Sequence, residues 1–266
     1  MIDQEIQQKL RVKYNPEGSE LRCMQLRMLE MLKYIDKVCS ENNIPYWLSS
    51  GTCLGAIRHG GFIPWDDDCD IEMLSQDYNR FISIIANDHE CPYKIQTRKN
   101  DPGYFLTFGK LRDLKSEIKE GNASEKTTYK YNGIYIDIFP MERSNSRRVS
   151  ELISKIFFHL YVKGARINGS ILNRFWNGVL MNIIIAPLSL LNKIGTRNRL
   201  RHKNPGGFPW ERYYNDIFPL KRCDFEGISL PVPNNCERYL NNIYGNYMEL
   251  PDLSKIELHT VDVKIW

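Results

Sequence analysis

The feature that most constrains this sequence is a run of aspartates, WDDDCDIE, which leads into an apolar stretch. Asp66, Asp68 and Asp70 are spaced two apart. In a strand over Cys69 to Leu74, Asp68 and Asp70 would point to the same side, about 6.6 Å apart along the backbone. Carboxylates held that close repel each other unless a cation neutralises them, and Mg²⁺ prefers such oxygen ligands. The pattern predicts a Mg²⁺ site for a phosphate-containing substrate, although many D-x-D turns are simply solvated.

A small-residue turn precedes the aspartates. The apolar strand expected at Tyr46 to Ser49 ends in Ser50-Gly51-Thr52, and a helix is expected from Cys53 to Arg58. Free backbone N–H groups and the helix dipole favour a phosphate at such a helix start. Arg58 and His59 follow closely enough to be candidates for binding donor phosphates. The alternative is that Arg58 only lies along the surface and that His59 is an ordinary surface residue.

A third carboxylate is expected in the strand from Gly133 to Pro140, where isoleucines alternate with Tyr135, Asp137 and Phe139. Burying an aspartate among isoleucines without a partner is costly, so Asp137 is predicted to complete the metal site. An edge-strand aspartate that faces water is the alternative. On an expected strand at Phe105 to Leu111, Lys110 shares a side with Arg112, and the two are candidates to neutralise a diphosphate or are simply solvent-facing.

The periodicity predicts an α+β fold. Amphipathic helices are expected over 19–43, capped by Ser19, and over 77–87, and a further strand over 93–97. A strand, a Gly-Ser/Thr turn and a strand with D-x-D is the layout of the polymerase beta type of nucleotidyltransferase fold, a mixed sheet flanked by helices. A length of 266 residues suits one domain. Residues 113–128 are expected to form a loop, and about 146–203 a helical insertion.

That insertion carries most of the positive charge. Twelve Lys and Arg residues stand against the single Glu151 between Arg143 and Lys203. Val179 to Leu191 is apolar but shorter than the roughly 20 residues of a spanning helix. The combination suggests peripheral docking on an anionic membrane, where each nearby cation contributes about 1 kcal/mol, or a core helix with solvated basic ends. No RNA-reading motif accompanies it, so no nucleic-acid partner is expected.

Cysteine usage and the N-terminal segment bear on location. The seven cysteines have no metal-ligand spacing, so they are expected to be reduced thiols and no zinc site is predicted. The start, MIDQEIQQKL, has no apolar signal region. The expected location is cytoplasmic, with association at the inner face of the membrane through the basic insertion.

Three separated segments carry a family resemblance. SSGTCLGAIRHGGFIPWDDDCDIEM, GIYIDIFPME and FEGISLPVP...YLNNIYGNYMELP, spanning about residues 20 to 260, resemble the LicD/fukutin-like phosphotransferases. The resemblance implies a single LicD-type catalytic domain over 1–266. It also implies transfer of a phospho-alcohol group, with phosphocholine from CDP-choline favoured, and release of CMP. The acceptor would be a hydroxyl of a cell-surface glycan or lipid-linked glycan, such as a lipopolysaccharide, teichoic acid or capsule precursor.

The resemblance also gives the carboxylates roles. Asp68 and Asp70 would hold Mg²⁺, or Mn²⁺, while Asp137 completes the site and orients or deprotonates the acceptor. Choline would need an aromatic cage. The candidates are Trp47, Trp65, Tyr135, Trp210, Tyr213 and Tyr214. His259 is a further candidate for the site.

Three alternatives remain at this stage. The donor could be CDP-ribitol or CDP-glycerol, which would need hydrogen-bonding groups instead of a cage. The enzyme could be an ordinary nucleotidyltransferase that releases pyrophosphate. The chain could also be a membrane- or nucleic-acid-binding module with a degenerate site, against which stand the three carboxylates and the Gly51-Thr52 turn.

Overall fold

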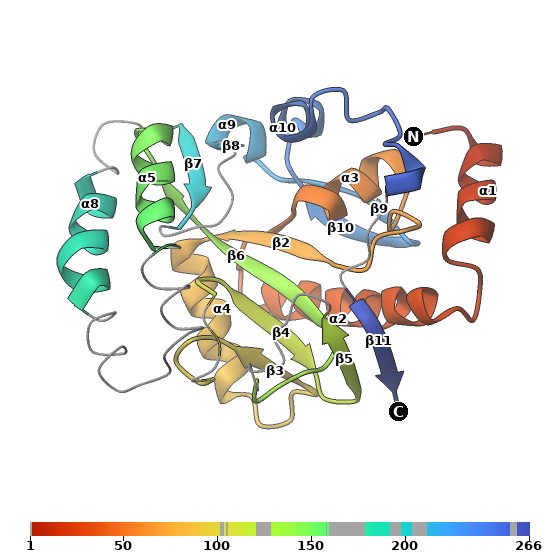
Figure 1. Ribbon diagram of the computed structural model, residues 1–266, viewed down its shortest axis with the longest axis horizontal. Coiled ribbons are helices and arrows are strands. Elements are labelled where there is room, and N and C mark those ends of the chain that lie inside the picture. Colours follow the sequence, from red (N-terminus) through yellow and green to blue (C-terminus); the bar gives the residue numbers. More distant parts are fainter. Residues whose placement is uncertain are drawn as a thin grey trace.

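The computed structural model describes most of the chain. The described residues are 2–101, 104, 106–120, 129–157, 159, 179–191, 198–203, 212–255 and 260–266. Strands and helices form an α+β architecture in which helices surround a mixed sheet (Figure 1). The predicted α+β class and the mixed sheet flanked by helices are therefore confirmed. Trp210 and His259 lie outside the described residues.

The central sheet has seven strands, and β6 (Tyr135–Arg143) is its longest. The order is β1 (Trp47–Leu48), β2 (Asp70–Leu74), β6, β4 (Gly109–Asp113) and β3 (Tyr93–Gln96). Farther along β6, β7 (Arg199–His202) pairs with it, and β8 (Arg212–Tyr213) pairs with β7. Only β2 and β6 run parallel within this described sheet. The parallel pair brings the two predicted carboxylate strands side by side.

The helix expected over 19–43 is present as α2 (Glu20–Glu41), which is capped by the Ser19 side chain accepting from the Arg22 amide. Helix α1 (Gln4–Tyr14), which precedes it, was not predicted. Met28 and Met31 are almost fully buried, so the methionine stripe of α2 is a core face. Helix α3 (Ser50–His59) follows β1, and α4 (Ser75–Asn87) packs against β2, β3 and β6.

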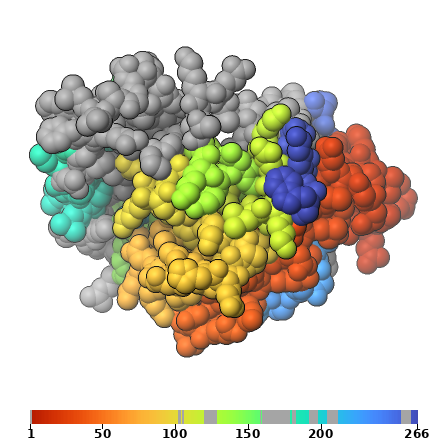
Figure 2. Space-filling model, turned by 90° about the horizontal axis from the view of Figure 1, so that it is seen from below, coloured from red at the N-terminus to blue at the C-terminus, as the bar shows by residue number. Residues whose placement is uncertain are grey.

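Two antiparallel pairs of strands lie outside the central sheet. Strands β9 (Lys221–Phe225) and β10 (Ile228–Val232) form one, which contacts α3 and β1. Strand β5 (Ser116–Glu120) pairs with β11 (Thr260–Ile265) in the other. Figure 2 shows the C-terminal residues at the surface between the red N-terminal segment and the yellow-green part of the chain. Helix α9 (Tyr214–Ile217) precedes β9, and α10 (Cys236–Tyr244) follows β10.

Two expectations from the sequence were wrong here. The expected loop over 113–128 contains β5, because its pairing partner β11 is more than a hundred residues away and leaves no local signal. The expected strand from Phe105 begins only at Gly109 and extends to Asp113. Pairing with β3 and β6 sets these limits, since Tyr93 is opposite Asp113 and Gly109 is opposite Ile138.

In the basic segment, residues 143–203, the described residues are helical only in part. It includes α5 (Arg147–Phe157), a π-helix η2 (Leu180–Ile185) and α8 (Ala186–Leu191). Ile153, Phe157 and Ile185 form a small apolar cluster between them. Its far end, expected to be helical, is instead β7 of the central sheet. Among the described residues, no helix has both the length and the apolar character needed to cross a membrane.

Candidate active site

Three charged residues form a row across the centre of the sheet. Asp70 on β2 is directly opposite Asp137 on β6, and Asp137 is opposite Lys110 on β4. Side chains at paired positions of neighbouring strands share a face of the sheet. Lys110 Nζ lies 2.8 Å from Asp137 Oδ1, and both side chains are largely buried. The structure thus brings together three of the residues singled out in the sequence.

A cavity of about 910 Å³ opens beside this row, at the end of β2 where Asp70 lies. Asp66, Asp68 and Asp70 line one part of it together with Ser50 and Gly51 of α3. The opposite wall comes from the end of α10 and the segment after it. Residues of that wall include Ile243, Tyr244, Asn246, Tyr247, Glu249, Leu250, Pro251 and Asp252. Five carboxylates and one guanidinium, that of Arg58, therefore face this space.

The carboxylates are crowded enough to disturb one another's protonation. Burial raises the pKa of Asp70 well above its usual range, and the charges of Asp68, Asp137 and Asp66 raise it further. Burial and the Asp68 charge raise the pKa of Asp66 in the same way. For Asp137 burial raises the pKa to about 6, although Lys110 acts in the opposite direction. A bound cation would relieve this repulsion.

The residues of the small-residue turn hold the aspartates in place. Thr52 Oγ1 accepts a hydrogen bond of 2.8 Å from the Asp70 amide, which fixes the first residue of β2 against α3. A Cβ atom on Gly51 would lie 2.9 Å from Asp66 Oδ2. Gly51 is therefore needed for the close approach of the Asp66 carboxylate to the start of α3.

Lys110 and Arg112 point to the same side, as predicted, and both lie against Tyr135. The ring centroid of Tyr135 is 3.3 Å from Lys110 Nζ and 4.5 Å from Arg112 Cζ. Arg112 is almost fully buried and donates to Gln96 Oε1 and to the Gly133 carbonyl. Lys110 is ion-paired with Asp137, a predicted metal carboxylate, and the Tyr135 ring is covered by the protein's own cations.

Arg58 and His59 are both buried and have well-defined partners. Arg58 Nη1 donates to the Tyr247 and Glu249 carbonyls at 2.9 and 3.1 Å, so Arg58 fixes the far wall of the cavity. Its Nε donates to His59 Nε2, and His59 Nδ1 lies 2.6 Å from Gln7 Oε1. Burial and the neighbouring Arg58 charge lower the pKa of His59 to about 3, so the ring is neutral. His59 does not line the cavity.

A second buried carboxylate, Glu72, was missed in the sequence. It follows Asp70 by two residues and is fully buried. Its partners are Arg212 Nη2 and His202 Nε2, both at 2.8 Å, with Trp47 Nε1 at 2.8 Å and the Tyr239 hydroxyl at 3.1 Å. The signal was available, because Glu72 is an acid in an apolar strand, as Asp137 is.

The carboxylate-rich donor set suits a hard cation such as Mg²⁺. As the side chains stand, no group of three or more His, Cys, Asp or Glu residues in the described part of the chain is arranged to hold a metal ion. Mg²⁺ sites commonly use one or two carboxylates and complete their coordination with substrate phosphates and water. Asp68 and Asp70 at the cavity wall, with Asp137 beside Asp70, fit that arrangement.

Some of the aromatic residues line the cavity, and others lie outside its lining. Of the predicted cage candidates that the structure describes, Trp65 lines the cavity, and its ring packs edge-on against Tyr14 and His59. Trp47 is fully buried and donates to Glu72. Tyr213 and Tyr214 are in β8 and α9, outside the cavity lining. Tyr244 and Tyr247 line the cavity instead, and they belong to the segment YLNNIYGNYMELP that carried part of the resemblance.

Comparison with known proteins now adds to this geometry. Residues 43–160 match the family model described as "LicD/FKTN/FKRP, nucleotidyltransferase domain". Lipopolysaccharide cholinephosphotransferase LicD of Haemophilus influenzae is 27% identical over 253 residues, which cover 87% of this chain and 92% of that protein. Residues 43–160 are therefore a LicD-family domain. This homology supports a LicD-type phosphotransferase.

Shorter matches connect this LicD-family chain to animal proteins. Ribitol-5-phosphate transferase FKTN of Homo sapiens is 33% identical over 104 residues, or 39% of this chain and 22% of FKTN. Ribitol 5-phosphate transferase FKRP of Homo sapiens is 38% identical over 55 residues, or 21% of this chain and 11% of FKRP. The chain therefore spans only a small part of FKTN and FKRP, but nearly the whole length of LicD.

Proposed function

We propose that this LicD-family enzyme transfers phosphocholine from CDP-choline to a hydroxyl of a cell-surface glycan or lipid-linked glycan and releases CMP. The single observation that carries the proposal is the placement of Asp68 and Asp70 in a 910 Å³ cavity, with Asp137 directly beside Asp70. The name of the bacterial relative supports a choline donor, and its coverage supports an activity of the whole chain.

Asp68, Asp70 and Asp137 would hold Mg²⁺, or Mn²⁺ in its place. Such an ion supplies charge neutralisation at the phosphoryl group and Lewis acidity. Asp137 would orient the acceptor hydroxyl or accept its proton. Lys110, 2.8 Å from Asp137, would orient this carboxylate and balance negative charge on the donor. Gly51, Thr52 and Arg58 would shape the donor side of the cavity.

The cavity lining suits a cationic headgroup. Trp65, Tyr244 and Tyr247 line it, and a quaternary ammonium is attracted to aromatic faces. Glu249 and Asp252 add negative charge to the lining. A neutral polyol such as ribitol would donate hydrogen bonds to these carboxylates but would lack the attraction between opposite charges. The similarity to FKTN nevertheless keeps ribitol phosphate as the second candidate group.

Nucleotide release would test the proposal directly. Purified protein with Mg²⁺ receives CDP-choline, CDP-ribitol or CDP-glycerol in turn, with and without crude glycan acceptor, and CMP is followed over time. We expect EDTA-sensitive CMP release that is fastest with CDP-choline and absent in Asp70→Asn. CMP release from CDP-ribitol, but not from the other two compounds, would show that CDP-ribitol and not CDP-choline is the donor. Pyrophosphate from CTP or ATP, with no CMP from any CDP-alcohol, would indicate an ordinary nucleotidyltransferase and refute the proposal.

The proposal extends to the fold and the location of the enzyme. We propose a nucleotidyltransferase-type fold of polymerase beta kind in one domain over 1–266, located in the cytoplasm with no nucleic-acid partner. The basic segment would contact the inner face of the membrane. Exposed Leu152, Ile183 and Leu190 accompany Arg147 and Arg148 on its described helices, which is the composition of an interfacial surface. Salt-sensitive binding to anionic but not neutral vesicles would test this location.

A further inference from the structure

We propose that Glu226, at the tip of the β9–β10 hairpin, is a positioning residue for the metal carboxylates. It acts on the aspartate loop, defined here as residues 60–69 between α3 and β2. The predicted effect on metal binding rests on the proposed function, but the Glu226 contacts themselves lie outside the cavity.

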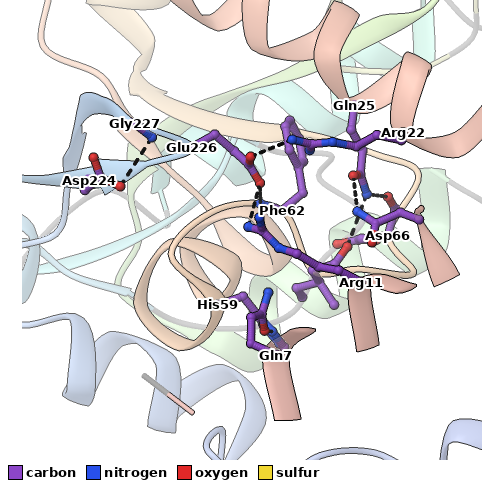
Figure 3. A network of polar contacts seen from close by, with 12 residues as sticks. Gln7, Arg11, Arg22, Gln25, His59, Phe62, Asp66, Asp224, Glu226 and Gly227 are labelled. Atoms are coloured by element: carbon purple, nitrogen blue, oxygen red, sulfur yellow. Dashed lines mark hydrogen bonds and ion pairs between the residues drawn. The ribbon is translucent and has the colours of Figure 1, made fainter. Parts of the chain in front are cut away.

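The hairpin tip is joined to the beginning of the aspartate loop by backbone and side-chain hydrogen bonds (Figure 3). The Glu226 amide donates to the Gly60 carbonyl at 3.0 Å, and Glu226 Oε1 accepts from the Phe62 amide at 3.3 Å. Backbone groups in an irregular loop need such partners when they are buried. Glu226 therefore provides hydrogen-bond partners for the loop backbone, as a neighbouring strand does in a sheet.

Gly61 shows how closely the carboxylate is inserted. A Cβ atom at Gly61 would lie 2.2 Å from Glu226 Oε1, a separation at which one of the two must move. Glu226 itself has φ +54° and Gly227 has φ +81°, so the tight turn of the hairpin aims the side chain at the loop. The Glu226 carboxylate therefore occupies the space that a side chain at Gly61 would need.

Two arginines hold the carboxylate in this position. Arg22 Nη2 of α2 lies 2.9 Å from Glu226 Oε2, and Arg11 Nη2 of α1 lies 3.2 Å from Oε1. The Glu226 side chain is only 7% exposed and that of Arg22 only 10%, so the pair is screened little by water. Charge-assisted hydrogen bonds of this kind are about twice as strong as neutral ones. Glu226 therefore joins α1, α2 and the hairpin to a single point of the loop.

The other end of the loop is held by α2. Gln25 Nε2 donates to the Ile63 and Asp66 carbonyls at 3.2 and 2.9 Å. The amide is itself oriented, because Gln25 Oε1 accepts from Asn15 Nδ2 at 2.7 Å. The loop is fixed at Gly60 and Phe62 by Glu226 and at Ile63 and Asp66 by Gln25. Asp68 and Asp70 follow directly, so their positions depend on these anchors.

Loss of an outer-shell partner commonly weakens metal binding ten-fold or more, because ligand oxygens must be placed to within a few tenths of an ångström. Glu226→Gln would weaken the hydrogen bond from the Phe62 amide, since a neutral amide oxygen is a poorer acceptor than a carboxylate, and would leave Arg22 buried beside an uncharged group. The loop would then sample positions in which Asp68 and Asp70 are poorly placed. The expected effect appears in metal affinity and in local exchange before it appears in global unfolding.

The test compares Glu226→Gln with Glu17→Gln. Glu17 also contacts Arg22, at 3.4 Å, but its side chain is 82% exposed and it does not touch the loop. Hydrogen exchange of the peptide covering 60–66 and Mn²⁺ binding without donor are measured for each full-length protein. We expect about ten-fold faster exchange and about ten-fold weaker Mn²⁺ binding for Glu226→Gln, and wild-type values for Glu17→Gln.

Unchanged exchange in Glu226→Gln, or faster exchange without weaker Mn²⁺ binding, would overturn the positioning role. Equal effects of Glu17→Gln would also overturn it, since the Arg22 contact alone would then explain the result. If the wild type bound no Mn²⁺, the proposed metal site would fail, while the exchange data would still decide whether Glu226 holds the loop.

A double-mutant comparison covers the case in which Glu226→Gln folds poorly. Gly61→Ala should accelerate loop exchange in the wild type, because its new methyl group displaces the carboxylate. In a Glu226→Ala background the same change should add little, since the clashing group is gone. Additive effects of Gly61→Ala and Glu226→Ala would contradict direct contact as the cause.

Discussion

Asp70 and Asp137 stand directly opposite each other on the parallel strands β2 and β6, although one helix and three strands lie between them among the described elements. Lys110 continues the row on β4. Charge repulsion between the carboxylates is therefore a property of the strand register. Each prediction below concerns what this register or its immediate supports require.

Neutralising either carboxylate should abolish transfer without unfolding the protein. Asp70→Asn and Asp137→Asn are expected to lower turnover on the order of 10³-fold, because charge stabilisation at the phosphoryl group is lost. Without metal Asp70→Asn should not melt below the wild type, since it removes a charge that is repelled by its neighbours. Asp137→Asn also removes the ion-pair partner of the buried Lys110, so some loss of stability is expected for this variant alone. Thermal melts with and without Mg²⁺ provide the check, and wild-type turnover in either variant would refute the assignment.

Thr52 should contribute to stability and to metal binding through its hydroxyl group alone. Thr52→Val keeps the shape but removes the acceptor of the Asp70 amide, which leaves that N–H without its partner. We expect a loss of about 1–3 kcal/mol in the free energy of unfolding and weaker Mn²⁺ binding. Thr52→Ser keeps the oxygen and serves as the matched control. Equal urea midpoints for the valine and serine variants would contradict this explanation.

Protonation of His59 should make the fold sensitive to acid. Its pKa is lowered to about 3 in the folded protein from an ordinary value of 6.5, so the unfolded chain binds the extra proton between these values. The stability linked to His59 is therefore complete above pH 6.5 and is lost as the pH falls toward 3, by at most about 1.4 kcal/mol per pH unit. His59→Gln should flatten the dependence of unfolding free energy on pH in that window. A parallel profile for His59→Gln would disprove it, and the exposed His89→Gln is the control.

The buried Glu72 should matter for stability more than for chemistry. Removing its charge in Glu72→Gln leaves Arg212 buried without its carboxylate, and breaking such a pair costs about 3–5 kcal/mol. Chemical denaturation of Glu72→Gln measures this cost. The exposed pair of Lys9 and Glu5 offers a comparison, because Glu5→Gln should change stability by less than about 1 kcal/mol. Similar costs for the two variants would show that the Glu72 network is not a buried ionic anchor.

Much of the site was predictable because its signals are local. The D-x-D spacing identified Asp68 and Asp70 as cavity-facing, and the isoleucine alternation around Asp137 placed that residue in a buried strand. The methionine stripe of α2 followed from helical periodicity, which depends only on neighbouring residues. The same argument would have found Glu72 if it had been applied to the strand after Asp70.

Only the tertiary structure decided which distant segments meet. No local pattern pairs β5 with β11, places the hairpin tip of Glu226 beside Gly61, or brings Tyr244 and Tyr247 to the wall opposite the aspartates. Arg58 lines the cavity, and folding also gave it the Tyr247 and Glu249 carbonyls as partners, which no local pattern predicts. The sequence by itself determined the chemistry of the carboxylates and the class of fold. Long-range packing decided how the site is walled and supported, because backbone and side-chain partners far apart in the chain are chosen only when the whole core forms.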